Sequence, residues 1–208
     1  PMIDRSYSRM VGQLEKYGIV VVSLQPRTLN EMAAYWRVQG RLLGCEQAAE
    51  KMVAIFSQQR AAIEAVTQKI RPKKQVYFEA IHKKMKTFTA TAMAASALAI
   101  AGGINVAADA QSVRGTNIAI FGKERILSLG ERIDVYLAQR GTMNRITLDE
   151  IRNEPGFDAI RAVKEGHVFL IDEAVVSRPT MRLITGICQI GAVLYPQYFP
   201  AALPDICQ

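Results

Sequence analysis

The chain has 208 residues, of which 50% are hydrophobic and 22% are charged. This composition is typical of a globular protein and argues against extensive disorder. The net charge of +7 comes from dispersed basic residues without a long stripe or a recognisable nucleic-acid module, so we expect no nucleic-acid partner.

The first third of the chain predicts one strand and two helices. Residues 18–24 form a continuous β-branched run, which is typical of a strand buried on both faces of a parallel sheet. Thr28 and Glu31 have the spacing of a capping box, so a helix is predicted over 28–43. Over 46–70, apolar residues recur at mostly three- and four-residue steps, which predicts a single helix of over about 30 Å. A helix of that length can link two lobes.

After residue 70, strands and helices alternate, which is typical of an α/β layer with a mostly parallel sheet. The predicted strands are 75–79, 133–138 and 167–171. The predicted helices are 89–101, 123–130, 148–153, 157–164 and 179–194.

The stretch 97–110 is nearly free of charge and needs a separate explanation. A helix that spans a bilayer needs about 20 consecutive apolar residues, and the paired glycines Gly102 and Gly103 interrupt this run. We expect a buried, alanine-rich core helix that ends at these glycines, where a left-handed backbone is tolerated.

No enzyme motif stands out, and we predict no catalytic residue. The chain contains no G-x-S-x-G, no G-x-x-x-x-G-K-[ST] and no H-E-x-x-H. Cys45, Cys188 and Cys207 lack CxxC spacing and predict neither a metal site nor a disulfide framework, although they leave room for one disulfide. The opening residues lack the pattern of a signal peptide.

The predicted ligand site lies in the loops that follow the strands, because ligands bind at the carboxyl ends of strands in parallel α/β sheets. Three such loops carry basic or hydrogen-bonding groups. Ser177 could cap a helix that begins at Pro179, and such a helix start favours an anion. The alternatives are a solvated loop for the lysines, and for Arg178 an ion pair with Asp172 or Glu173. The residues that we predict to bind a ligand are His82, Lys84, Lys86, Thr87, Arg140, Gly141, Met143 and Arg178.

Several motifs stand in an order that characterises one family. They are Tyr77-Phe78-Glu79, the segments 101–107, 124–136 and 159–169, and a closing helix with Pro179, Arg182, Leu183 and the segment 194–196. Together they resemble the class III substrate-binding proteins of ABC importers for iron-siderophores, haem, cobalamin and, in some members, oxyanions. One position departs from the family, because Ile133 stands where the family has a proline.

The resemblance implies an extracytoplasmic solute-binding component of an ABC importer, without enzymatic activity or a cofactor of its own. Such a protein captures an iron chelate, either a siderophore complex or haem, in a cleft between two lobes and delivers it to a membrane permease. Docking on the permease uses an acidic residue on each lobe in this family. Residues 87–101 contain no Asp or Glu, so we assign no docking residue.

The resemblance also implies that the chain is a fragment. Residues 1–45 would be the remnant of an N-terminal lobe, 46–70 the interlobe helix and 71–208 a complete three-layer C-terminal lobe with a parallel sheet. The export signal would lie outside this fragment, and the protein would be periplasmic or a cell-surface lipoprotein.

Other functions fit parts of the pattern. The same fold could bind an oxyanion or cobalamin. A chelatase or a nitrogenase-like metal-cofactor protein would have a related architecture, with His82 and Glu79 as its candidate metal-binding pair. A partner-binding module without a ligand is a further alternative, and an incomplete sheet with an open edge predicts self-association of the fragment.

Overall fold

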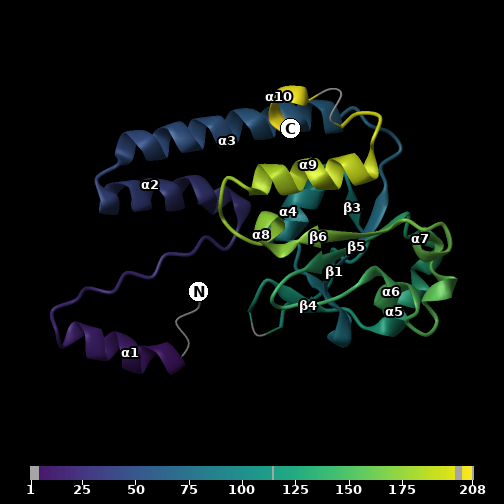
Figure 1. The fold of residues 1–208 in the computed structure, drawn as a ribbon, viewed down its shortest axis with the longest axis horizontal. Coiled ribbons are helices and arrows are strands. Elements are labelled where there is room, and N and C mark those ends of the chain that lie inside the picture. Colours follow the sequence, from purple (N-terminus) through teal and green to yellow (C-terminus); the bar gives the residue numbers. More distant parts are fainter. Residues whose placement is uncertain (1–4, 114, 200–202, 208) are drawn as a thin grey trace.

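The computed structural model of the chain describes residues 5–113, 115–199 and 203–207 (Figure 1). The α-helices are α1 (Arg5–Glu15), α2 (Met32–Leu43), α3 (Glu46–Thr67), α4 (Met93–Ile100), α5 (Lys123–Ser128), α6 (Leu148–Arg152), α7 (Arg161–Lys164), α8 (Glu173–Val176), α9 (Leu183–Leu194) and α10 (Pro204–Cys207). The strands are β1 (Gln75–Ile81), β2 (Lys86–Phe88), β3 (Ile104–Asn105), β4 (Ile118–Ile120), β5 (Val135–Arg140) and β6 (Val168–Asp172), and short 3-10 helices are η1 (Leu29–Glu31), η2 (His82–Lys84), η3 (Gly130–Arg132) and η4 (Phe157–Ala159). The predicted α/β alternation after residue 70 is confirmed.

A mixed, mostly parallel sheet forms the centre of the described chain. Its strand order is β4-β2-β1-β5-β6, with β3 beside β1. The strands β1, β3, β5 and β6 run parallel, whereas β2 is antiparallel to both β1 and β4. The sequence did not predict β2, β3 and β4, because strands of two or three residues are too short to show an alternating pattern.

Helices cover both faces of this sheet (Figure 1). On one face Val76 and Phe78 of β1 pack into a buried apolar cluster with α4 and α9. On the other face Tyr77 and Tyr136 pack into a second cluster with residues of α5, α6 and α7. Alternate residues of β1 therefore enter different cores, as the two-residue period of a strand requires.

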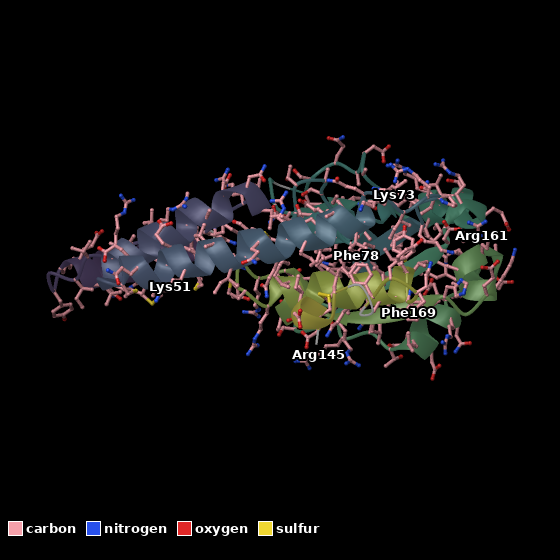
Figure 2. All side chains as sticks on the ribbon, turned by 90° about the horizontal axis from the view of Figure 1, so that it is seen from above. Lys51, Lys73, Phe78, Arg145, Arg161 and Phe169 are labelled. Carbon is pink, nitrogen blue, oxygen red and sulfur yellow. A yellow bond between two sulfur atoms is a disulfide. The ribbon has the colours of Figure 1, made fainter. Side chains whose placement is uncertain are left out.

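The helices α2 and α3 form an arm that extends from the sheet, and α3 continues over the sheet core (Figure 2). The helix predicted over 46–70 is confirmed with an end at Thr67, and its 22 residues span about 33 Å. Within the arm, Trp36 of α2 packs against Phe56 of α3 at 5.3 Å between ring centroids. The Trp36 indole N–H also donates to the carbonyl of Pro179 at 3.2 Å.

The predicted strand over 18–24 is wrong. The chain is extended there but pairs with no described strand, and the Val20 side chain is 84% exposed. A β-branched run favours a strand only where neighbouring strands supply hydrogen bonds and a packing surface. The described part of the chain supplies neither at this place.

The predicted start of the last helix at Pro179 is also wrong, because α9 begins at Leu183. The Ser177 hydroxyl donates to the side chain of Gln139 and does not cap α9, which begins six residues later. The carbonyl of Pro179 is engaged by Trp36. The segment between α8 and α9 is therefore a loop that holds the arm.

The apolar stretch that ends α4 is a core element. Six of the eight residues of α4 are buried, and Gly102 follows the helix with a φ of 90°, which confirms the predicted glycine ending. The Tyr195 hydroxyl donates to the Gly102 carbonyl at 3.0 Å. No helix that the structure describes is both long and apolar enough to cross a membrane.

A single disulfide between Cys188 and Cys207 joins α9 to α10. The third cysteine, Cys45, is free and exposed. Cys188 and Cys207 thus form the one disulfide that a count of three cysteines allows.

Candidate functional site

The loops after β1, β5 and β6 lie side by side at one edge of the sheet, because these three strands are parallel neighbours. Hydrogen bonds connect the loops. The backbone N–H of His82 donates to Asn144 Oδ1 at 3.0 Å, and the backbone N–H of Met143 donates to Glu173 Oε2 at 3.3 Å. The expectation that these loops form one rim is therefore confirmed.

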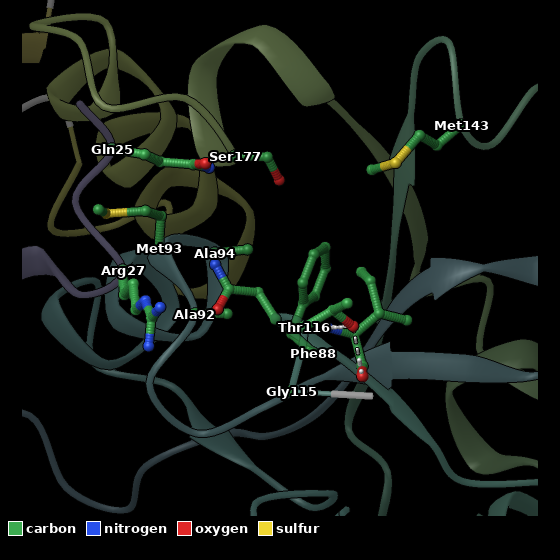
Figure 3. A pocket seen from close by; sticks show the side chains of 12 residues that line it. Gln25, Arg27, Phe88, Ala92, Met93, Ala94, Gly115, Thr116, Met143 and Ser177 are labelled. Atoms are coloured by element: carbon green, nitrogen blue, oxygen red, sulfur yellow. Dashed lines mark hydrogen bonds between the residues drawn. The ribbon is translucent and has the colours of Figure 1, made fainter. Parts of the chain in front are cut away.

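A cavity of about 280 Å³ lies at this edge (Figure 3). Its apolar lining comes from Phe88, Met93, Ile118 and Met143, and its polar lining includes Gln25, Arg27, Thr116, Asn117 and Ser177. These residues come from the extended segment before η1, from β2, β4 and α4, from the loop before β4, and from the loops after β5 and α8. Pockets for small ligands have about 300–1,000 Å³ and combine apolar walls with a few polar groups, so the volume of this cavity is just below that range.

The start of α4 contributes to the cavity, since Ala92, Met93 and Ala94 line it. The first N–H groups of a helix have no acceptor within the helix, and Ala92 provides no capping side chain. Helix N-termini attract anions through these N–H groups and the helix dipole. The sequence predicted a helix start at Pro179 beside the ligand site, whereas the helix start that lines this cavity belongs to α4.

Among the described residues that line the cavity, Arg27 is the charged one. Its backbone N–H donates to Glu31 Oε2 at 2.7 Å, whereas its guanidinium forms no ion pair with the residues that the structure describes. A free guanidinium and a helix start line the same cavity, and both suit an anionic group.

Of the eight predicted site residues, Met143 lines this cavity and its side chain is about half exposed. Arg140 and Arg178 are exposed and lie outside the lining. Arg178 is 3.8 Å from Glu173, as the ion-pair alternative predicted. Gly141 packs closely against the side chain of Glu173. A Cβ at Gly141 would come within 2.4 Å of the Glu173 Cβ.

The loop predicted after β1 is shorter than expected, which changes the role of its residues. Met85 turns the chain with a φ of 43°, and Lys86 and Thr87 then belong to β2. Thr87 is fully buried, and its hydroxyl donates to the carbonyl of Phe78 at 2.7 Å. This corrects the expectation that Thr87 faces a ligand. Lys84 is exposed but lies outside the cavity lining.

His82 belongs to a buried polar cluster beside the cavity. Its Nδ1 lies 2.7 Å from Glu79 Oε2, and the same carboxylate accepts a hydrogen bond from the Tyr136 hydroxyl. Asn144 donates to Glu79 Oε1 at 3.2 Å. Glu79 has no exposed surface, and its carboxylate therefore depends on these three donors.

The cluster shifts the pKa of its members. Burial lowers the pKa of His82, but the hydrogen bond that it donates to Glu79 and the charges of Glu79, Glu154 and Glu150 outweigh burial and raise this pKa above its ordinary value. Burial and the Glu79 charge raise the pKa of Tyr136 and that of Tyr77 well above the ordinary value. Both tyrosines thus stay neutral.

Sequence reasoning missed most of this cluster. It considered Glu79 and His82 as a loose metal-binding pair, whereas the structure bonds them to each other. No group of three or more potential metal-ligating side chains occurs within the described ranges. The sequence carried no signal for Asn144, Tyr136 and Glu154. Only the packing of the sheet brings these distant residues next to His82 and Glu79.

A family model described as periplasmic binding protein matches residues 10–175 of the chain. The chain belongs to this family. Periplasmic solute-binding proteins are non-enzymatic components of transporters, so the chelatase interpretation is not supported. A comparison with curated proteins found no match.

Solved structures of periplasmic binding proteins share this fold. A periplasmic solute-binding protein from Veillonella parvula is 18% identical with a TM-score of 0.74, and the match covers 94% of this chain and 59% of that one. A protein from Staphylococcus epidermidis, named as a possible iron-binding, periplasmic solute-binding protein, is 22% identical with a TM-score of 0.76 over 91% of this chain and 72% of that one. IsdE of S. aureus complexed with heme is 15% identical with a TM-score of 0.72 over 92% of this chain and 74% of that one.

These identities establish the fold alone. The chain spans about three fifths of the length of the V. parvula protein. The fold therefore does not by itself assign to this chain the binding activity of a whole protein of this family.

Proposed function

We propose that this chain is part of the solute-binding component of an ABC importer that captures an iron chelate, either a siderophore complex or haem, and delivers it to a membrane permease. The observation that carries the proposal is the cavity at the carboxyl edge of the sheet, which combines an apolar wall with the Arg27 guanidinium and the start of α4. Haem and many ferric chelates present apolar surface next to anionic groups, which is the chemistry that this lining complements.

The size of the cavity bears on how the ligand would bind. At about 280 Å³ it is smaller than most sites for drug-sized ligands, so we expect it to hold one part of the ligand while the rest extends outward. Arg27 and the α4 start would hold an anionic group. Phe88 and Met143 would contact the apolar part.

Two relatives support the ligand class by their names, which mention iron binding and a complex with heme. A small oxyanion, the alternative with the same charge, would use the α4 start and Arg27 without the apolar wall. Cobalamin would use the apolar wall more than the anion site. The two binding elements therefore distinguish the ligand classes.

We further propose the division into 1–45 as part of an N-terminal lobe, 46–70 as interlobe helix and 71–208 as C-terminal lobe, because α3 runs from the arm over the sheet core. The disulfide between Cys188 and Cys207 supports a periplasmic or cell-surface location, since disulfides persist in oxidising compartments. Self-association through an open sheet edge stays a prediction, for which β4 and β6 are the edge strands.

Ligand titration tests the proposal. The chain has one tryptophan, Trp36, and its indole bonds to the loop that contains Ser177 of the cavity lining. We expect a ferric trihydroxamate or haem to quench this fluorescence and to raise the melting temperature. Cobalamin and molybdate serve as the other members of the panel. If no member quenches, shifts a spectrum or stabilises the chain, the proposed function is refuted.

A further inference from the structure

Gln139 is a buried polar residue at the end of an apolar row on β5. Val135 and Leu137 of this strand pack into the core cluster that also contains residues of α4 and α9. Because side chains alternate between the two faces along a strand, Gln139 lies on the same face of the sheet. Gln139 has no exposed surface. A buried amide therefore stands where the row would otherwise continue with an apolar side chain.

The hydrogen bonds of the Gln139 amide are unbalanced. Its Oε1 accepts from the Ser177 hydroxyl, whereas its Nε2 has no acceptor among the residues that the structure describes. A buried donor without an acceptor loses its hydration and gains no bond in return. Stability alone does not account for a glutamine at this position, since an apolar side chain of similar size would avoid this loss.

Ser177 connects the Gln139 amide to the ligand cavity. It lines the cavity, and its side chain lies between those of Gln25 and Met143 in the view of Figure 3. Its backbone N–H donates to the Glu173 carbonyl at 3.0 Å, which fixes Ser177 at the end of α8. Because the hydroxyl proton is engaged by Gln139, the lone pairs of the Ser177 oxygen remain for a ligand. Ser177 thus offers an acceptor to the cavity.

The other polar elements of the cavity favour the opposite polarity. The Arg27 guanidinium and the first N–H groups of α4 line the same cavity, and both are hydrogen-bond donors. An anionic oxygen bound between them has no proton to give to Ser177. An acceptor at Ser177 repels such an oxygen, whereas a donor there binds it.

A rotation of the Gln139 amide reverses the polarity of Ser177. The terminal torsion of glutamine is broad and roughly two-fold, so a half turn exchanges the amide oxygen and nitrogen at nearly the same positions. With Nε2 beside Ser177, the amide donates to Ser177 Oγ, and the hydroxyl proton turns toward the cavity. One N–H of the buried amide then gains an acceptor, and no covalent bond changes.

We propose that Gln139 and Ser177 form a reversible hydrogen-bonding pair that recognises an anionic oxygen of the ligand, such as a carboxylate. When this oxygen binds, the amide turns over and donates to Ser177, and Ser177 donates to the ligand. Ser177 is then the residue in contact with the ligand, and Gln139 is a positioning residue that acts through it. The inference rests on the proposed function, because it assigns the anionic group of that ligand to this cavity.

Nuclear magnetic resonance of the Gln139 side-chain amide tests the rotation. Acetate is the probe, because it carries a carboxylate without the rest of a chelate. We expect acetate to shift one of the two Nε2 proton signals of Gln139 downfield, as this proton begins to donate to Ser177, and to cause no such shift in Ser177→Ala. The Gln111 amide, which donates to the Asp109 carbonyl at 3.1 Å, is the reference outside the cavity lining. Gln139 signals that acetate does not move, or that move equally in Ser177→Ala, would overturn the inference.

Binding of haem or ferric citrate, two chelates with free carboxylates, tests the consequence for the ligand. We expect Ser177→Ala to weaken binding by about tenfold or more, the usual effect of a lost hydrogen bond to a charged group. Ser128→Ala is the matched control, because its hydroxyl donates to the Arg125 carbonyl at 2.9 Å and Ser128 lies outside the cavity lining. This control should keep the affinity of the unmodified chain. Equal affinity in Ser177→Ala would contradict the proposal.

A second variant, Gln139→Met, covers the case in which Ser177→Ala does not fold. Methionine continues the apolar row and removes the unpaired amide, so the melting temperature should stay or rise. The affinity for haem should fall, but by less than in Ser177→Ala, because the hydroxyl remains. A lower melting temperature with unchanged affinity would show that the pair only holds the loop after α8, and would overturn the inference. If neither chelate binds while acetate shifts the Gln139 signal, the proposed function alone fails.

Discussion

Replacement of Glu79 by alanine tests whether the buried cluster stabilises the fold as its geometry indicates. The substitution removes a carboxylate that accepts from His82, Tyr136 and Asn144. Asn144 keeps its bond to the Gln139 carbonyl, but His82 Nδ1 and the Tyr136 hydroxyl lose their acceptor. The perturbation thus leaves two buried donors without a partner.

The magnitude follows from these two donors. A buried donor left unsatisfied costs about 1–3 kcal/mol, so two of them cost about 2–6 kcal/mol. Breaking a buried ion pair by removal of one partner costs about 3–5 kcal/mol, which agrees. We expect Glu79→Ala to lower the free energy of unfolding by about 3–5 kcal/mol, a large part of the 5–15 kcal/mol typical of a protein.

Urea denaturation at pH 7, followed by circular dichroism and Trp36 fluorescence, measures this loss. Glu131→Ala is the control, because it removes an equally charged group whose pairing with Lys164 is at the surface. The control should change the unfolding midpoint little. If Glu79→Ala shifts the midpoint no more than Glu131→Ala, the cluster does not contribute as we argue.

Three further predictions concern the proposed ligand site and the stability of the chain. Arg27→Ala should weaken binding of an anionic chelate in a fluorescence titration by about 1.5–3 kcal/mol, the usual strength of a hydrogen bond to a charged group. Arg140→Ala and Arg178→Ala, outside the lining, should weaken it less, and a larger loss in either would favour the rim predicted from sequence. Gly186→Ala should destabilise the chain by about 1–3 kcal/mol, because its Cβ would lie 2.2 Å from the Val175 carbonyl oxygen, and an unchanged melting temperature would contradict this packing. Cys188 and Cys207 are 19 residues apart, and by the loop-closure relation reduction of their disulfide should lower the free energy of unfolding by about 3 kcal/mol. An unfolding midpoint that does not change with reductant would contradict this prediction.

The elements that the sequence predicted well are those with a long local pattern. Apolar residues recur at helical spacing along the 22 positions of α3. The three longest strands, β1, β5 and β6, each have five residues or more. Since these strands are parallel, the prediction of one rim at their carboxyl ends required no tertiary information. The order of motifs also indicated the family before any fold was known.

The tertiary structure decided which residues face the cavity. A run such as 18–24 favours a strand locally, but a strand needs a partner, and none of the described strands pairs with it. The helix start that lines the cavity is at Ala92 rather than Pro179. Ser177 and Pro179 instead bond to Gln139 and Trp36. Competing hydrogen-bond partners of this kind are far apart in sequence.

The buried cluster shows the same limit most clearly. Glu79 is 57 residues from Tyr136 and 65 from Asn144, and no spacing in the sequence connects them. The sequence by itself determined the α/β alternation, the long helix and the edge at which a ligand site would form, because periodicity and strand direction are local properties. Only the packed sheet decided that His82 pairs with Glu79 and that Arg27 and the α4 start line the cavity, because burial and hydrogen bonding depend on which distant segments meet.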